Sequence, residues 1–217
     1  MAQVFISHSR HDRELVNNIK AIIENLGHQA YLYEYEAHPY DSSPDTEIMN
    51  EIRKSDLVFT FLTRNVDDMP HTKSWVISEV AIARDANKRT FVFEYENEFV
   101  SFPLPYLTDY MILDKHSVQD ILTVQRIAKK SLPQTGLPPE VGGGVLGVIL
   151  GAPFGPLGIL FGGLGGAWLG STLRPSGTPE IPFLIARCLW CGMQYNYYSP
   201  WVKKFPCPKC RRYLELR

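Results

Sequence analysis

Four cysteines near the C-terminal end of the chain have the spacing of a metal site. They form two Cys-x-x-Cys pairs, Cys188 with Cys191 and Cys207 with Cys210, and fifteen residues separate the pairs. Each pair can present two thiolates from one tight turn, and two such turns complete the tetrahedron that Zn²⁺ prefers. Four thiolates leave no open coordination position, so the predicted zinc is structural rather than catalytic. Two disulfides are the alternative use of these cysteines.

The segment around the cysteines, residues 183–217, is too short to bury much core, so metal binding is expected to fold it. Seven of its residues are basic: Arg187, Lys203, Lys204, Lys209, Arg211, Arg212 and Arg217. Glu215 is its one acidic residue, and the aromatic residues Tyr195, Tyr197, Tyr198 and Trp201 lie among them. Basic and aromatic residues together are compatible with nucleic acid or anionic lipid headgroups. The alternative is that the aromatic residues fill a small core and the charges keep the segment soluble.

The preceding part of the chain alternates apolar strands with amphipathic helices. Strands are predicted at 4–9, 29–36, 56–63, 89–96 and 110–114, and helices at 13–26, 44–54, 74–88 and 117–132. This alternation indicates an α/β fold with a doubly wound parallel sheet, in which ligands bind beyond the C-terminal ends of the strands. Here that edge comprises residues 7–12, 37–45 and 63–73. The chain has no Gly-x-Gly-x-x-Gly and no P-loop motif.

Three segments in this order, "VFISHSRHDRELV", "KSDLVFTFLT" and "SWVISEVAIA", resemble the Toll/interleukin-1 receptor (TIR) domain in its prokaryotic form. The resemblance covers roughly residues 1–115 and implies a flavodoxin-like sheet with strand order 2-1-3-4-5. The C-terminal cysteine segment resembles a zinc ribbon. An intracellular TIR partner domain argues against the disulfide alternative.

The TIR resemblance also implies an activity. Many prokaryotic TIR domains cleave NAD⁺ at the nicotinamide–ribose bond or cyclise the product, through a glutamate in a Trp-x-x-x-Glu helix. Trp75 and Glu79 stand at these positions, four residues apart, and therefore project from one helical face. A carboxylate suits the reaction because loss of neutral nicotinamide leaves an oxocarbenium-like ribose. The alternative to these catalytic roles is that Trp75 is a packing residue and Glu79 a solvent-exposed charge near the start of a helix.

Further substrate contacts are expected on the loops beside that helix. Ser9, Arg10 and Asp12 are candidates to hold the diphosphate or a ribose, and Tyr40 is a candidate to stack on a base or on the nicotinamide ring. Asp12 also has an ordinary reading as a helix N-cap. The second loop reads "HPYDSSPD", where the family usually has a Pro-Gly pair.

Residues 141–173 carry no charge over 33 positions. Glycines recur every fourth residue in two runs, at 143, 147, 151 and 155 and at 158, 162, 166 and 170, with a "GAPFGP" turn between them. Such a period indicates two glycine-zipper helices in a hairpin, whose grooves let another helix approach closely. The hairpin is expected to associate with a membrane or to join chains into an oligomer, and a flexible linker is the alternative reading.

These observations divide the chain into a TIR domain at 1–135, a glycine-zipper hairpin at 141–173 and a zinc ribbon at 183–217. Residues 1–135 hold 20 acidic and 14 basic side chains, and residues 136–217 hold 3 and 8. The start of the chain lacks the pattern of a signal peptide, so an intracellular location is expected, with the hairpin on the cytoplasmic face of a membrane. The expected function is that of an NAD⁺-cleaving enzyme activated by assembly, used in prokaryotic immune defence. The alternative is a non-enzymatic scaffold that assembles through TIR–TIR contacts.

Overall fold

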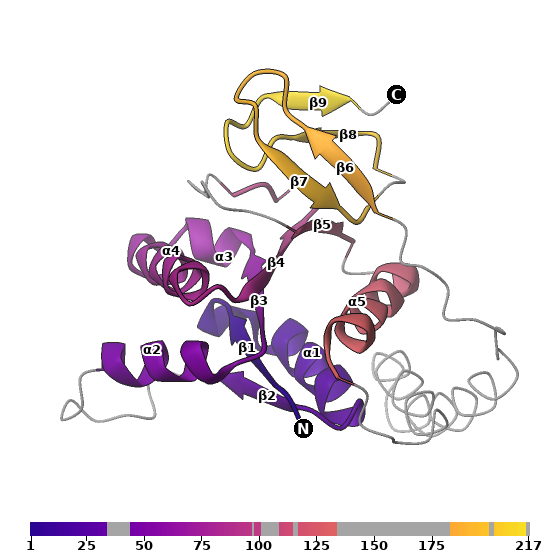
Figure 1. Cartoon of the computed structure of the whole chain (residues 1–217). Helices are drawn as coiled ribbons and strands as arrows, with labels where there is room; N and C mark the ends of the chain where they lie inside the picture. The colour runs from indigo at the N-terminus through magenta and orange to yellow at the C-terminus, as the bar shows by residue number, and fades with distance from the viewer. Residues whose placement is uncertain are drawn as a thin grey trace, which may run out of the picture. The chain divides into compact units, whose positions relative to one another are not determined.

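The computed structural model describes residues 1–33, 44–96, 98–100, 109–114, 117–133, 183–199 and 202–215. Strands and helices alternate along the TIR-like part as predicted (Figure 1). The strands are β1 (Gln3–Ser7), β2 (Gln29–Leu32), β3 (Leu57–Leu62), β4 (Arg89–Tyr95), β5 (Asp109–Leu113), β6 (Leu184–Arg187), β7 (Gln194–Tyr197), β8 (Lys204–Pro206) and β9 (Tyr213–Glu215). The helices are the 3₁₀ helix η1 (Arg10–Asp12), α1 (Arg13–Asn25), α2 (Pro44–Lys54), α3 (Arg64–Asp67), α4 (Pro70–Asp85) and α5 (Val118–Ser131).

One sheet of seven strands runs in the order β2-β1-β3-β4-β5-β7-β6. Its first five strands have the predicted order, and β3 pairs in parallel with both β1 and β4, as β4 does with β5. All six residues of β3 are buried, which agrees with its continuous apolar sequence and its place in the middle of a parallel sheet. The α/β fold with a mostly parallel, flavodoxin-like sheet is therefore confirmed.

The chain divides into two compact units. Among the described residues, one holds Met1–Ala2, Glu14–Ala30 and α5, and the other holds Gln3–Arg13, strands β3 to β9 and helices α2 to α4. The first unit holds α1, whose predicted apolar stripe is buried at Val16, Ile19, Ile22 and Ile23. Gly27 has a φ of 79° after this helix, a left-handed conformation that glycine adopts without strain, so it suits the end of α1.

In the second unit, the C-terminal segment continues the sheet. Strand β7 pairs in parallel with β5, through Asp109 opposite Asn196 and Tyr110 opposite Tyr197, and β6 pairs with β7 in antiparallel fashion. Strands β8 and β9 form a separate two-stranded sheet. The sequence pattern does not predict the β5–β7 pair, because a contact between residues 87 positions apart leaves no local periodicity.

Buried polar groups hold β5 against this C-terminal segment. Asp109 is 2 % exposed and accepts hydrogen bonds from Tyr198 Oη at 2.8 Å, Asn196 Nδ2 at 3.1 Å and Arg89 Nη2 at 3.1 Å. A carboxylate taken out of water is stable only when its oxygens are satisfied in this way, so removal of any donor destabilises the junction.

A second buried carboxylate, Glu94 at the end of β4, repeats this arrangement. It accepts from the backbone N–H of Val100, from Tyr110 Oη and from Arg211 Nη1, the last at 3.1 Å. Burial raises the pKa of Glu94, and the Arg211 guanidinium counteracts that rise. Because Arg211 directly follows Cys210, this ion pair ties the cysteine segment to the central sheet.

Helix α4 contributes apolar side chains to two separate cores. Val76 and Val80 belong to a cluster that also contains Cys188, Cys207 and Tyr110, so this cluster spans α4, the sheet and the cysteine segment. Ala83, Ile82 and Trp75 belong to a second cluster, whose other members are Phe5, Ile48, Ile52, Val58, Tyr31 and Tyr33. The position of α4 therefore depends on packing against both clusters.

Within the ranges that the structure describes, no helix combines the length and the apolar character that crossing a membrane requires. The predicted glycine-zipper hairpin at 141–173 lies outside those ranges.

Candidate functional site

Helix α4 carries the Trp-x-x-x-Glu motif and begins at Pro70, four residues before the predicted start at 74. Pro70 occupies the first turn, where a missing N–H costs nothing because that donor has no helical partner. The added turn places His71 on the same face as Trp75 and Glu79, since all three are spaced by four residues.

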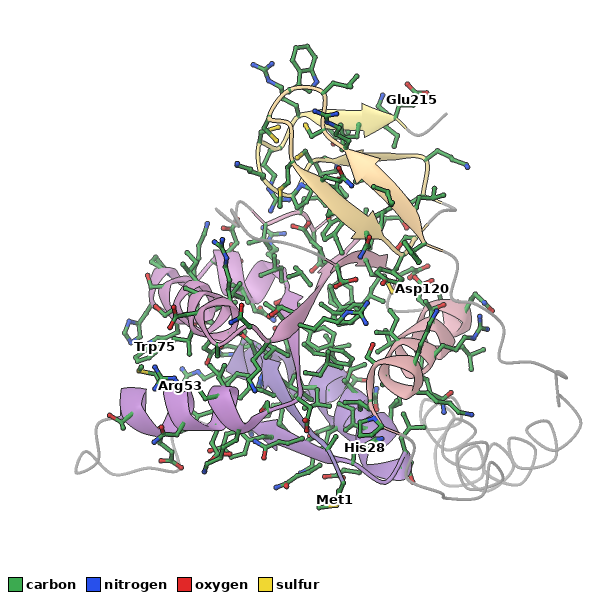
Figure 2. The ribbon with its side chains drawn as sticks, viewed as in Figure 1. Met1, His28, Arg53, Trp75, Asp120 and Glu215 are labelled. Atoms are coloured by element: carbon green, nitrogen blue, oxygen red, sulfur yellow. The ribbon has the colours of Figure 1, made fainter. Side chains whose placement is uncertain are left out.

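A pocket of about 360 Å³ lies between α4 and α2. Figure 2 shows Trp75 on α4 at the side that faces α2. The pocket is lined by Ile48, Met49, His71, Ser74, Trp75, Ser78, Glu79 and Ile82. The predicted pair Trp75 and Glu79 thus faces one cavity in which apolar and polar side chains converge, as they do in small-molecule sites.

Glu79 is the buried carboxylate of this pocket, with 7 % of its surface exposed. Its Oε2 accepts a hydrogen bond from the hydroxyl of Ser7, the last residue of β1. Burial raises the pKa of Glu79 from 4.5 to about 7, because a charged carboxylate loses its hydration there, while the Ser7 hydrogen bond lowers it. Glu79 therefore changes charge near neutral pH, which is typical of a group that does chemistry.

Trp75 is oriented by His71, one turn earlier on α4. The indole Nε1 donates to His71 Nε2 at 3.2 Å, and the two rings stand at 85° with centroids 6.1 Å apart. This hydrogen bond requires His71 Nε2 to be unprotonated, since a protonated ring nitrogen cannot accept. His71 thus holds the indole at the pocket beside Glu79.

The other predicted substrate contacts do not line this pocket in the described residues. Ser9 is buried and caps η1, where its Oγ accepts from the His11 backbone N–H at 3.4 Å. Arg10 is exposed, and its Nε donates to His11 Nε2 at 3.3 Å. Tyr40 lies outside the described residues.

Asp12 is a buried structural link as well as a candidate contact. Its Oδ2 accepts from Thr63 Oγ1 at 2.6 Å and its Oδ1 from Asn65 Nδ2 at 2.7 Å. These bonds join the loop after β1 to the loop after β3, at the strand edge where the alternation of elements predicts a ligand site. The N-cap of η1 is Ser9, not Asp12.

Sequence reasoning missed two groups that hold the predicted pair in place, one beside Glu79 and one beside Trp75. Ser7 ends a strand, so its contact with Glu79 joins residues 72 positions apart and has no local signal. The position of His71 on this helix face could be predicted from the sequence, because His71 precedes Trp75 by one turn and follows a proline that marks a helix start.

The four cysteine sulfurs lie within 4.8 Å of one another. Cys188 Sγ and Cys210 Sγ are 3.6 Å apart, and Cys191 Sγ and Cys207 Sγ are 3.8 Å apart. A tetrahedral zinc with bonds of about 2.3 Å requires sulfurs about 3.8 Å apart, whereas a disulfide requires about 2.05 Å. The cluster therefore fits one tetrahedral metal ion.

The two Cys-x-x-Cys turns have matching backbones. Gly192 N–H donates to Cys188 O at 2.9 Å, and Arg211 N–H donates to Cys207 O at 2.9 Å. Both donors have a left-handed φ, 72° for Gly192 and 60° for Arg211. Backbone N–H groups of residues 190 and 191 also point at the first sulfur, and those of 209 and 210 at the third. Such donors stabilise thiolates, as metal ligation requires.

Comparison with known proteins identifies one part of the chain. A family model described as the TIR domain matches residues 4–121. A comparison with curated proteins gives no match. The matched region spans β1 to the first residues of α5, and with them the pocket and Glu79. Because this region covers more than half of the chain, the protein belongs to the TIR domain family.

Proposed function

We propose that this chain cleaves NAD⁺ at the bond between nicotinamide and ribose, with Glu79 as the catalytic carboxylate. The observation that carries the proposal is a buried glutamate with a pKa near neutrality that faces a pocket beside Trp75. A scaffold that only docks to other TIR domains has no need to bury a carboxylate at the cost of its hydration.

In the proposed reaction the glycosidic bond breaks and its electron pair leaves with nicotinamide, which departs as a neutral molecule. The ribose carbon then carries positive charge, and ionised Glu79, of which only 7 % is exposed, stabilises it. Water supplies the oxygen that completes ADP-ribose and releases a proton. An internal attack by the adenine base gives a cyclic product instead.

The pocket supplies groups that suit the nicotinamide end of the substrate. Trp75 offers an aromatic face for the ring, and the hydroxyls of Ser74 and Ser78 border the same space. Ser9, Arg10, Asp12 and Tyr40 remain proposed contacts to the rest of the dinucleotide. Arg10 is the exposed cation among them, which suits a diphosphate.

The direct test is incubation of the purified full chain with NAD⁺ and measurement of free nicotinamide. Release that saturates with NAD⁺ and scales with protein supports the enzyme. A protein that assembles in solution, yet releases no nicotinamide at any concentration or in the assembled state, contradicts the enzyme and favours the scaffold.

The pH dependence of kcat/KM is expected to show an acid limb near pH 7. Glu79 must be ionised to stabilise the ribose cation, and its pKa is about 7, so activity rises as pH increases through that value. Ser7→Ala removes the hydrogen bond that lowers this pKa and is expected to move the limb to higher pH. If the midpoint of the acid limb is the same in Ser7→Ala as in wild type, another group governs the pH profile. Ser78→Ala, also at the pocket, serves as the control.

We also propose that the cysteine site holds one structural Zn²⁺. Elemental analysis of reduced protein, purified without chelators, is expected to give about one zinc per chain, since four thiolates complete one tetrahedral site. Alkylation of the protein, unfolded with a chelator but without reductant, checks the alternative, because released metal ligands react and cysteines held in two disulfides do not. A zinc content near zero, or cysteines found as disulfides in freshly lysed cells, would contradict the zinc site.

Assembly is the proposed means of activation. TIR domains generally self-associate, and the glycine period at 143–170 favours a second contact that gathers chains, in a membrane or in a helical bundle. Gathering raises the local concentration of TIR domains without any new contact between them. We place this activity inside the cell, in prokaryotic immune defence, on the strength of the TIR resemblance.

A further inference from the structure

The exposed apolar side chains of the described residues are concentrated in the cysteine segment. Apart from Met1, every large hydrophobic residue exposed in the described ranges lies between 183 and 213: Phe183, Leu184, Ile185, Leu189, Trp190 and Tyr213. Exposed groups of this kind gather where a protein meets another surface. Leu189 and Trp190 are 91 % and 64 % exposed and occupy the first cysteine turn, which joins β6 to β7 (Figure 1).

The second cysteine turn shows that the fold does not need an apolar residue at the position of Trp190. The two turns share their backbone hydrogen bonds and their left-handed fifth residue. The positions of Leu189 and Trp190 are taken in the second turn by Pro208 and Lys209, of which Lys209 is exposed. Gly192, which ends the first turn, also has open space beside it, since a Cβ there would meet none of the described residues within 4 Å.

Basic side chains accompany these exposed residues. The Arg212 guanidinium lies over the Trp190 ring, 4.4 Å from the ring centroid. The Lys204 ammonium lies 5.8 Å from the ring centroid of Tyr213. Residues 183–215 hold six basic and one acidic side chain. Four thiolates around one divalent ion contribute a net −2, so the segment keeps a net charge of about +3 when metal is bound.

We propose that Leu189, Trp190 and Arg212 form a tip that inserts into the surface of an anionic lipid bilayer. Leu189 decides the kind of partner, because an aliphatic side chain gains free energy by entering hydrocarbon and has no ring to stack on a nucleic-acid base. Trp190 has the amphipathic indole that prefers the interface, and Arg212 lies over it at the depth of the lipid phosphates. The net positive charge attracts the segment to anionic headgroups.

The test uses the full chain and vesicles of phosphatidylcholine, alone or with roughly 30 % phosphatidylserine, at physiological salt. Wild type is expected to float with the anionic vesicles. Leu189→Ser/Trp190→Ser is expected to lower this partitioning at least about tenfold, because both inserting side chains are lost. Arg212→Gln is expected to reduce it less, by weakening attraction to the phosphates.

Three controls keep the result specific. Zinc content and thermal melting show that the double variant is folded, which is expected because neither side chain is a ligand. Ile185→Ser removes an apolar side chain of 65 % exposure from the same segment, outside the tip, and is expected to leave partitioning unchanged. Residues 141–173 are uncharged and present in every variant, so any binding that they cause is measured with the phosphatidylcholine vesicles and subtracted before wild type and variant are compared.

Several outcomes overturn the proposal. One is equal flotation of wild type and the double variant, and another is binding that ignores phosphatidylserine. A wild type that leaves vesicles free but binds a single-stranded oligonucleotide, and loses that binding in the double variant, would assign the tip to nucleic acid instead. None of these readouts depends on NAD⁺ cleavage, so a failure here leaves the proposed activity in place.

Discussion

Glu79→Gln is expected to lower NAD⁺ cleavage by at least about 10³-fold while the fold persists, since electrostatic and acid–base groups commonly contribute that much. Glutamine has nearly the same shape and still accepts the Ser7 hydrogen bond through its amide oxygen. What it lacks is the negative charge that opposes the cation on ribose. Nicotinamide release, measured at saturating NAD⁺ and at pH 8, checks the prediction.

The same variant is expected to be more stable than wild type at alkaline pH. The pKa of Glu79 is raised from 4.5 to about 7 in the folded state, so its contribution to stability is fully present below pH 4.5 and is lost as pH rises through 7. Glutamine does not titrate, so wild type becomes less stable than the variant by about 3 kcal/mol above pH 8. Denaturant unfolding at pH 4 and pH 8 measures the difference.

Glu24→Gln is the matched control for both experiments. Glu24 is a half-exposed residue of α1 that pairs with Lys20 at 3.7 Å, so its loss is expected to change neither turnover nor the pH dependence of stability. Full turnover by Glu79→Gln in a preparation free of other hydrolases would end the catalytic assignment. Inactivity without the stability gain would mean that Glu79 is ionised at no cost in the folded protein.

Removal of the proposed Zn²⁺ is expected to unfold the C-terminal half of the sheet together with the cysteine segment. Cys188 and Cys207 are fully buried in the same cluster as Val76, Val80 and Tyr110, so the site cannot come apart alone. Structural zinc contributes on the order of 10 kcal/mol to small zinc-dependent folds, which rivals the whole stability of a domain of this size. A strong chelator is therefore expected to lower Tm by more than about 10 °C.

Amide hydrogen exchange locates that unfolding. Amides of β4 and β5 are expected to lose protection in Cys207→Ser or after chelation, because β7 pairs with β5 and Arg211 pairs with Glu94. Leu189→Ser, which changes the first cysteine turn without touching a ligand, is the control and is expected to retain both metal and Tm. Unchanged protection of β5 in a metal-free sample would show that the cysteine segment and the TIR sheet are independent.

The local elements of this protein were determined by its sequence. The stripe from Val16 to Ile23 predicts α1 because a helix repeats every 3.6 residues, and the apolar run at 57–62 predicts a strand buried on both faces. The cysteine cluster was predicted as well, since two Cys-x-x-Cys turns contain most of the geometry they need. The motif of Trp75 and Glu79 was found through the TIR resemblance, and one helical face explains why they share a pocket.

Only the tertiary structure decided what surrounds these groups. The Ser7 hydroxyl reaches Glu79, Thr63 and Asn65 reach Asp12, and β7 adds to the sheet beside β5, all across dozens of residues. The residue types alone predict neither these contacts nor the burial that raises the pKa of Glu79 to about 7. The physical reason is that hydrogen-bond partners and desolvation depend on which distant segments exclude water from a side chain, whereas periodicity and turn chemistry act within a few residues of each position.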